Sequence, residues 1–339
     1  MIIDKQFLFI IGSPKSGTTW LQIMIGAHPL VCTTVELTLY SRYTAPWIKA
    51  WKGEADSIKR GRWNQGLPFL WTEDEFYDFL REFIGKVYER VVATNPQATH
   101  ILDKHPGYSM YVEDINKILP NARFIHIIRD GRDVAGSMVA ARKKIGYGTG
   151  TISESSAAWQ EHIWAARKAR QYHGRYLEIR YEDLLTTGVD TLKTVFDFCG
   201  LSISIEDIAA IVDAHQFEKM KAKRQSADQR VKTNAASYRK GKAGSWQEDM
   251  DPMQRYLFDE IAGDLLHELG YANDDWWAES RIQRFTLPLL AATSTGKRRW
   301  ETVARAAKAL LGPTLSGYIR TMRSRIRSKK PRTSSNNTG

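Results

Sequence analysis

The chain has 339 residues, of which 42% are hydrophobic and 26% are charged, and its formal net charge is +11. This composition is close to the globular average and excludes collagen, mucin-like stalks and wholesale disorder. A chain of this length buries roughly three-quarters of its unfolded surface, so we expect a sizeable core. Two cysteines, Cys32 and Cys199, are too few for a disulfide framework or a four-cysteine zinc site. This cysteine content fits a reducing compartment.

The positive charge is concentrated at the C-terminal end. Residues 281–339 contain 14 Lys and Arg and one acidic residue, whereas residues 1–280 contain 35 basic and 37 acidic residues. We therefore expect one domain over residues 1–280 and a basic extension over residues 281–339, partly helical and then disordered. Such an extension is typical of contact with nucleic acid, anionic lipid or another polyanion, or of a solubilising end.

Membrane-spanning and secretory segments are not expected. No stretch reaches the roughly 20 apolar residues needed to cross a bilayer, and the N-terminal apolar run is too short for a secretory signal. The sequence predicts a cytoplasmic protein. Residues 300–311 and 318–327 predict short basic amphipathic helices, which are typical of helices on anionic membranes. The hypothesis is that the extension holds the protein at the periphery of a membrane.

Strand and helix patterns alternate along the first 280 residues. The predicted strands span residues 7–11, 100–103, 124–128 and 176–180. The predicted helices span residues 18–27, 74–92, 108–119, 132–144, 155–173, 189–199 and a segment between Asp251 and Gly270. Residues 225–250 lack periodicity and predict a long loop. The alternation predicts a three-layer α/β fold, a parallel sheet flanked by helices.

A glycine-containing loop links the first predicted strand to the first predicted helix. Residues 12–20 read GSPKSGTTW. Backbone N–H groups of such a loop, together with the N-terminus of the helix, bind anions. Gly17 allows close approach of the backbone, and Thr18 and Thr19 add hydroxyl donors. The sequence therefore predicts a phosphate-binding loop, and the alternative is a turn that merely uses Gly and Pro.

The loop differs from the Walker A loop, G-x-x-x-x-G-K-[ST]. Thr18 occupies the position of the Walker lysine, and the lysine of this loop is Lys15. A triphosphatase needs the Walker lysine at the β- and γ-phosphates and a hydroxyl on Mg²⁺. The change indicates a different leaving group and disfavours a P-loop kinase or nucleotidase, which remains an alternative.

A second candidate anion site follows the predicted strand 124–128. Arg129 stands at the end of this strand, and Ser137 lies eight residues later in the next predicted helix. Ligands of parallel sheets bind at the C-terminal ends of strands, and a guanidinium group suits a phosphate. The alternative is a structural pairing of Arg129 with Asp130 or Asp133.

A third cationic segment lies in the predicted long loop. Residues 237–246 read SYRKGKAGSW and include Arg239, Lys240 and Gly241. Cations among glycines and aromatic residues suit a flexible clamp on an anion. On its own, the segment fits a solvated basic loop equally well.

Taken together, these segments resemble the sulfotransferases that use 3′-phosphoadenosine 5′-phosphosulfate (PAPS). PKSGTTW at residues 14–20 looks like the 5′-phosphosulfate loop, and FIHIIRDGRDVAGS at residues 124–137 looks like the 3′-phosphate motif. LEIRYEDLL at residues 177–185 is similar to the segment that places a tyrosine, here Tyr181, near the adenine. RKGKAGSW at residues 239–246 resembles the closing loop RKGxxGDW, with Ser245 in place of the aspartate.

The resemblance implies a P-loop-like fold, PAPS as the donor, 3′-phosphoadenosine 5′-phosphate (PAP) as the product, and no metal ion. Lys15 would stabilise the bridging oxygen of the departing nucleotide, and Lys104 would stabilise the sulfonyl oxygens. Trp20 would stack on the adenine. The implied donor-binding residues are Lys15, Ser16, Gly17, Thr18, Thr19, Trp20, Arg129, Ser137, Tyr181, Arg239, Lys240 and Gly241.

Two residues are candidates for the base that takes the acceptor proton. His105 follows Lys104, and family members that act on phenols and steroids use a histidine in a Lys-Thr-His segment, although this chain lacks the threonine. Glu36 stands at a spacing similar to that of the glutamate base in tyrosylprotein members. Either residue type can serve as a general base, and Glu36 is favoured. The alternatives are a core or capping histidine and a solvated surface acid.

The motifs look more like those of members acting on carbohydrates, glycolipids or peptides than like those of phenol and steroid enzymes. We expect an acceptor hydroxyl or amine on a carbohydrate, glycolipid or other natural product. The aromatic residues Tyr40, Tyr43, Trp47 and Trp51 suit contact with sugar rings or lipid, or simply a core. A basic nucleic-acid-binding protein is a further alternative, but it does not explain the two anion motifs, so no nucleic acid partner is expected.

Overall fold

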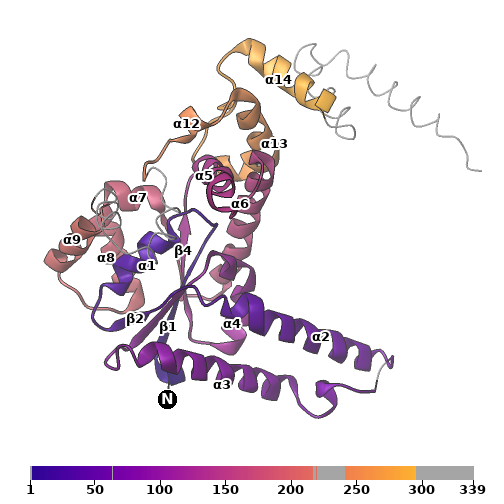
Figure 1. The fold of residues 1–339 in the computed structure, drawn as a ribbon, viewed down its shortest axis with the longest axis vertical. Helices are drawn as coiled ribbons and strands as arrows, with labels where there is room; N and C mark the ends of the chain where they lie inside the picture. The colour runs from indigo at the N-terminus through magenta and orange to yellow at the C-terminus, as the bar shows by residue number, and fades with distance from the viewer. Residues whose placement is uncertain (1, 63, 217–218, 220–240, 295–339) are drawn as a thin grey trace, which may run out of the picture. The chain divides into compact units, whose positions relative to one another are not determined.

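A parallel sheet with helices on both faces forms the core of residues 1–249 (Figure 1). The structure is a computed structural model that describes residues 2–62, 64–216, 219 and 241–294. This architecture confirms the predicted three-layer α/β class. The predictions for the remaining residues, including the two amphipathic helices and the disordered end of the extension, lie outside the described residues.

The five strands of the sheet are all parallel and have the order β2-β3-β1-β4-β5. They are β1 (Gln6–Ile11), β2 (Val31–Thr33), β3 (His100–Lys104), β4 (Arg123–Ile128) and β5 (Tyr176–Arg180). The four predicted strands are confirmed. Strand β2 has no counterpart among them, because three residues are too few for a recognisable alternation pattern.

The chain divides into two compact units, residues 1–249 and residues from 250 onward. The α-helices in the described part of the first unit are α1 (Thr18–Gly26), α2 (Ala45–Lys59), α3 (Glu73–Val92), α4 (Val112–Ile118), α5 (Gly131–Ile145), α6 (Ile152–Arg167), α7 (Tyr181–Thr186), α8 (Gly188–Cys199), α9 (Ile205–Ala214) and α12 (Trp246–Asp249). Short 3-10 or π-helical turns span Ile2–Asp4, Tyr40–Thr44, Leu67–Phe69, Pro106–Tyr111 and Lys168–Gln171. Helix α12 corrects the expectation of a loop up to residue 250.

The sheet separates two apolar layers because successive side chains of a strand point to opposite faces. Phe7 and Phe9 of β1 pack in one cluster with residues of α2, α3 and α4, where Trp51 and Phe76 stack with their ring centroids 4.4 Å apart. Leu8 of β1 packs in the other cluster with residues of α1 and α8. Helices α1, α7, α8 and α9 accordingly lie on one side of the sheet, and α2, α3 and α4 on the other (Figure 1).

The parallel strands end at a common edge. Loops that follow β1, β2 and β4 start there at Gly12, Thr34 and Arg129, and β3 and β5 end there at Lys104 and Arg180. Ligands of open α/β sheets bind outside the carboxyl ends of the strands. The strand order therefore brings the predicted site residues, which are far apart in the sequence, to one edge of the sheet.

The second unit contains α13 (Pro252–Glu268) and α14 (Arg281–Ser294). Asp251 caps α13 through a capping box with Gln254, which confirms the predicted start of this helix. The predicted boundary at residue 280 stays a prediction. Among the described residues, no helix is long and apolar enough to cross a bilayer.

Candidate active site

The glycine-containing loop folds tightly between β1 and α1. Gly17 has φ 95°, and a Cβ there would lie 2.5 Å from the Tyr181 ring. Gly12 has φ 149°, and a Cβ there would lie 2.5 Å from the Ile127 carbonyl oxygen. Lys15 at the tip also has a positive φ, 70°. Close approach of neighbouring groups therefore requires glycine at both positions, and a tight loop of this kind suits an anion.

Polar atoms of this loop are available for an anion. Ser13, Ser16 and Thr18 are all buried, and Ser16 Oγ has no hydrogen-bond partner in the described part of the chain. Gly17 precedes the first residue of α1, whose first N–H groups lack intrahelical partners. A buried hydroxyl without a partner is costly unless a ligand satisfies it. The loop therefore fits a phosphate or a phosphosulfate group.

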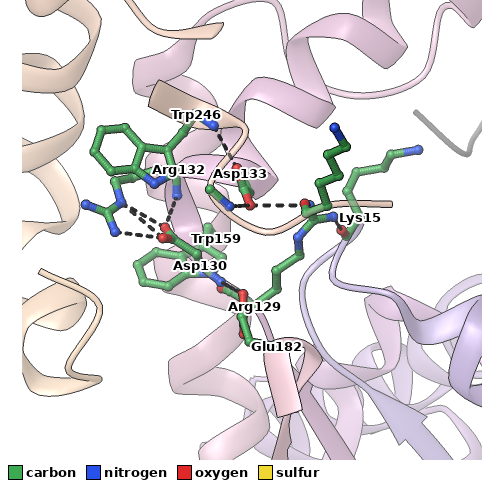
Figure 2. Close-up of polar contacts among 10 residues, drawn as sticks. Lys15, Arg129, Asp130, Arg132, Asp133, Trp159, Glu182 and Trp246 are labelled. Atoms are coloured by element: carbon green, nitrogen blue, oxygen red, sulfur yellow. Dashed lines mark hydrogen bonds and ion pairs between the residues drawn. The ribbon is translucent and has the colours of Figure 1, made fainter. Parts of the chain in front are cut away.

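Arg129 joins this loop to the segment that precedes α12 (Figure 2). Its Nη1 donates to the Lys15 carbonyl oxygen at 3.2 Å, and its Nη2 donates to the Lys242 carbonyl oxygen at 2.9 Å. Nη2 also lies 3.4 Å from Asp133 Oδ2. Arg129 Nε is buried and has no partner among the described residues. The pairing with Asp133 is thus present, as the alternative interpretation expects, yet Arg129 also keeps a donor for a ligand.

Asp133 fastens the segment before α12 to α5 (Figure 2). Its carboxylate accepts from Gly244 N at 2.9 Å and from Trp246 N at 2.8 Å. Arg132 lies over the Trp246 ring, 3.9 Å from its centroid, and pairs with Asp130 at 2.7 Å. The described part of the predicted closing loop, residues 241–246, therefore lies beside Arg129.

The structure also describes the predicted donor-binding residues Ser137, Tyr181 and Gly241. Gly241 is described and has φ 62°, whereas Arg239 and Lys240 lie outside the described residues. Ser137 is buried in α5. Gly17 packs against the Tyr181 ring. The guanidinium carbon of Arg129 lies 4.4 Å from the centroid of the same ring.

Trp20 packs edge-on against Tyr181, with ring centroids 5.6 Å apart. Its indole Nε1 donates to the His215 carbonyl oxygen at 2.8 Å. These contacts fix the Trp20 ring next to the ring of Tyr181. The two aromatic residues that the resemblance places at the adenine therefore lie together.

Three of the predicted catalytic residues, Lys104, Glu36 and His105, meet beside the loop. Lys104, at the end of β3 and almost fully buried, donates to Thr19 Oγ1 at 3.0 Å and forms an ion pair with Glu36. Glu36 has 43% of its side chain exposed, and its other oxygen lies 3.9 Å from His105 Nε2. The structure thus brings both candidate bases to Lys104. The pairing of β2 with β3 explains this, because Glu36 follows β2 by three residues.

His105 also caps the helical turn that follows it. Its Nδ1 accepts from Gly107 N at 3.1 Å, so this hydrogen bond assigns the proton of the neutral imidazole to Nε2. Burial is the main cause that lowers the pKa of His105, with Lys104 and Arg42 adding to it and Glu36 opposing. A neutral His105 therefore has its acceptor nitrogen already in use, as the alternative interpretation of a capping histidine expects.

Comparison with known proteins decides the family. The model of the Sulfotransferase family matches residues 8–207, which is more than half of the chain. The chain belongs to the sulfotransferase family. The match covers the glycine-containing loop, Glu36, Lys104, Arg129 and Tyr181.

Relatives of this sulfotransferase include curated proteins and a solved structure. It is 25% identical over 202 residues to a putative protein-tyrosine sulfotransferase of Caenorhabditis briggsae (59% of this chain, 67% of the relative). It is 24% identical over 204 residues to protein-tyrosine sulfotransferase 2 of Gallus gallus (59% and 53%). The match thus spans about half to two-thirds of these relatives. A mouse sulfotransferase, SULT7A1 complexed with PAP, has the same fold, with TM-score 0.51, 19% identity and coverage of 83% and 88%.

A buried carboxylate that no sequence motif identifies supports the site of this sulfotransferase. Asp103 is fully buried beside Lys104 and accepts from the hydroxyls of Tyr88 at 2.5 Å and Tyr108 at 3.2 Å. The Tyr108 hydroxyl in turn accepts from Leu39 N at 3.1 Å. Asp103 therefore ties β3 to the segment that carries Glu36. No motif marks this contact, because Tyr108 and Leu39 are 69 residues apart.

Replacing Asp103 by Asn is expected to change how stability depends on pH. Burial raises the pKa of Asp103 from 3.8 to about 6, so the folded state holds this proton more tightly than the unfolded state. The contribution of the protonated Asp103 carboxyl to stability is complete below about pH 4 and is lost as the pH rises through about 6. The unfolding free energy of Asp103→Asn, measured with urea, should therefore gain up to about 3 kcal/mol relative to the wild type between about pH 4 and pH 7. A difference between the two proteins that does not change with pH would contradict this.

Proposed function

We propose that this protein transfers the sulfonate group of PAPS to an acceptor hydroxyl. The observation that carries the proposal is the contact of buried Lys104 with both Thr19, in the first turn of α1, and Glu36. This contact joins the first turn of α1, directly after the glycine-containing loop, to a carboxylate. The loop has Thr18 where a Walker A loop has its lysine. The family membership supports the reaction class.

The donor would be held at two places. The backbone of residues 15–19 and the Ser16 hydroxyl suit the 5′-phosphosulfate, because this hydroxyl is buried without a partner among the described residues. Arg129 and Ser137 suit the 3′-phosphate, and the Nε of Arg129, which has no partner among the described residues, provides the donor. Trp20 and Tyr181 offer aromatic surfaces for the adenine. When bound, PAPS supplies the activated sulfonate group.

Glu36 is proposed as the general base rather than His105. His105 uses its acceptor nitrogen on Gly107, whereas the Glu36 carboxylate is partly exposed and accessible to an acceptor. Glu36 would take the proton of the acceptor hydroxyl as the acceptor oxygen bonds to sulfur. The bond from sulfur to the bridging phosphate oxygen breaks, Lys104 stabilises the sulfonyl oxygens, and Lys15 stabilises the oxygen that leaves with PAP.

The acceptor is proposed to be a carbohydrate, glycolipid or other natural product with a free hydroxyl. A tyrosyl hydroxyl is the second candidate, which the names of the C. briggsae and G. gallus relatives favour. Both acceptor classes present a hydroxyl to the same base. A cytoplasmic location and docking of the basic extension on an anionic membrane remain predictions.

Calorimetric titration of the full chain tests the donor assignment. We expect PAP to bind at least about 10-fold more tightly than ATP, because only PAP offers a 3′-phosphate to Arg129, and a charge-assisted hydrogen bond contributes roughly 1.5–3 kcal/mol. EDTA should leave PAP binding unchanged. Tighter, magnesium-dependent binding of ATP would instead support the kinase or nucleotidase alternative.

A further inference from the structure

The short segment that carries Glu36 is fastened at both of its ends. Residues 34–39, which we call the Glu36 segment, leave the edge strand β2 and lead into the π-helical turn Tyr40–Thr44. Glu36 is exposed, whereas Cys32 before the segment and Leu39 at its end are buried. Exposed connections are more mobile than the elements they join, so the position of Glu36 depends on how the two ends are held.

Gln22 of α1 holds the first end of the Glu36 segment. Its side-chain amide donates to Thr33 Oγ1 and to the Thr34 carbonyl oxygen, both at 2.8 Å. Gln22 lies in the same helix as Thr19, whose hydroxyl accepts from Lys104 at 3.0 Å. The first end is therefore tied to a helix that also contacts Lys104.

The hydroxyl of Tyr108 holds the second end. It accepts from Leu39 N at 3.1 Å and donates to Asp103 Oδ2 at 3.2 Å. Asp103 directly precedes Lys104 in β3. Tyr108 is fully buried, and its ring packs on the imidazole of His105, with centroids 5.2 Å apart. One side chain thus joins the end of the Glu36 segment to the strand of Lys104.

The backbone of the Glu36 segment is strained directly before its contact with Tyr108. Thr38 has φ 51°, in the left-handed region that a β-branched residue rarely adopts. A residue keeps such a conformation only where the surrounding contacts determine it. The buried hydrogen bond from the next residue, Leu39, to Tyr108 is such a contact. A second is the hydrogen bond from Arg42 N to the Thr38 carbonyl oxygen, at 2.9 Å.

We propose that Tyr108 is a positioning residue that fixes Glu36 against Lys104. Its hydroxyl holds Leu39 and thereby keeps Thr38 in the left-handed conformation, which determines where the Glu36 carboxylate lies. This inference rests on the proposed sulfonate transfer, in which Glu36 is the general base. A misplacement of about 1 Å can lower a rate by about 100-fold, so the effect belongs to kcat and not to donor binding.

Tyr108→Phe tests the proposal, because it removes the hydroxyl and keeps the ring on His105. Turnover of the full chain is measured with PAPS and two acceptor probes, methyl β-glucoside and a tyrosyl peptide, and PAP affinity is measured by calorimetry. We expect kcat to fall by about 10- to 100-fold with whichever probe the wild type sulfonates. PAP affinity should not change. Wild-type kcat in this variant would overturn the proposal.

Tyr88→Phe is the matched control. The Tyr88 hydroxyl is also fully buried and donates to the same Asp103 oxygen, at 2.5 Å, but in the described part of the chain it makes no hydrogen bond to the Glu36 segment. An effect that passes only through Asp103 would therefore appear in both variants. We expect Tyr88→Phe to keep wild-type kcat. Equal losses of kcat in Tyr88→Phe and Tyr108→Phe would contradict the proposal.

Thr38→Asn distinguishes positioning from a general loss of stability. Asparagine adopts the left-handed conformation more readily than threonine, so it depends less on the hydrogen bond from Leu39 to Tyr108. Added to Tyr108→Phe, it should raise kcat by at least about threefold, whereas on its own it should leave kcat unchanged. A double variant no faster than Tyr108→Phe would count against the proposal.

A crystal structure of Tyr108→Phe gives a readout that needs no acceptor. We expect Thr38 to leave the left-handed region and Glu36 to separate from Lys104. A Glu36 that stays paired with Lys104 while Thr38 keeps its positive φ would overturn the proposal. If the wild type sulfonates neither probe, this structure decides the proposal alone. Failure of the wild type to bind PAP would instead refute the proposed function.

Discussion

Glu36→Gln is expected to lower kcat for sulfonate transfer by about 100-fold or more, which is the usual contribution of a general base. The amide keeps the size of the side chain and can still accept from Lys104, but it cannot take the acceptor proton. PAP affinity should change by less than about threefold, because Glu36 is not among the residues proposed to hold the nucleotide. Steady-state transfer and calorimetry on the same preparation measure both quantities.

A matched control and a competing variant make this result decisive. Glu82→Gln removes another glutamate that is paired with a lysine, Lys86, and this pair is exposed and outside the catalytic contacts. It should retain wild-type turnover. Activity that survives in Glu36→Gln and disappears in His105→Ala would assign the base to His105 instead. Activity that persists in both variants would remove both assignments.

Arg129→Ala is expected to weaken PAP binding by about 10- to 100-fold, since a charge-assisted hydrogen bond contributes roughly 1.5–3 kcal/mol. Affinity for 5′-AMP should fall much less, because this nucleotide has no 3′-phosphate. The ratio of the two dissociation constants therefore isolates recognition of the 3′-phosphate. Calorimetry with each nucleotide measures it.

The control for this variant is Arg142→Ala. Arg142 belongs to the same helix, α5, and is exposed, with its guanidinium donating to the Gly146 carbonyl oxygen at 2.7 Å. Its replacement should leave both affinities unchanged. If Arg129→Ala weakens PAP and 5′-AMP equally, Arg129 acts only by holding the carbonyl groups of Lys15 and Lys242 in place.

The sequence predicts the strands and the position of the glycine-containing loop well because their signals are local. Buried apolar runs such as residues 7–11 and 124–128 end in glycine or charged residues, and this contrast is visible in a single sequence. Strand β2 is different, since it has three residues and lies at an edge of the sheet. Its position nevertheless determines where Glu36 lies, because Cys32 pairs with Ile101 of β3.

The side-chain contacts of the site depend on segments distant in the sequence. Lys104 and Glu36 are 68 residues apart, and Asp133 is 113 residues from Trp246. Residue types and spacing identify these groups as candidates but contain no information about which candidates touch. The structure also places Arg129 in direct contact with Lys15, although the two motifs predict separate anion sites.

The burial of the aromatic residues also could not be predicted from their spacing in the sequence. The sequence leaves open whether Tyr40, Tyr43, Trp47 and Trp51 form a core or a binding surface. The structure divides them, with Tyr40 and Trp51 buried and Tyr43 and Trp47 exposed. Contacts with distant segments decide this division, as in the stacking of Trp51 on Phe76 of α3, and helix α2 has no predicted counterpart.

A crystal structure of the full chain with PAP tests the proposed donor site most directly. We expect the 5′-phosphate on the N–H groups of residues 15–19, and the 3′-phosphate within hydrogen-bond distance of Arg129 Nε and Ser137 Oγ. Lys15 and Lys104 should then both face the end of the nucleotide where the sulfonate is attached. A structure in which PAP leaves this loop empty, or in which Arg129 contacts only Asp133 and backbone carbonyls, would contradict the proposed donor site.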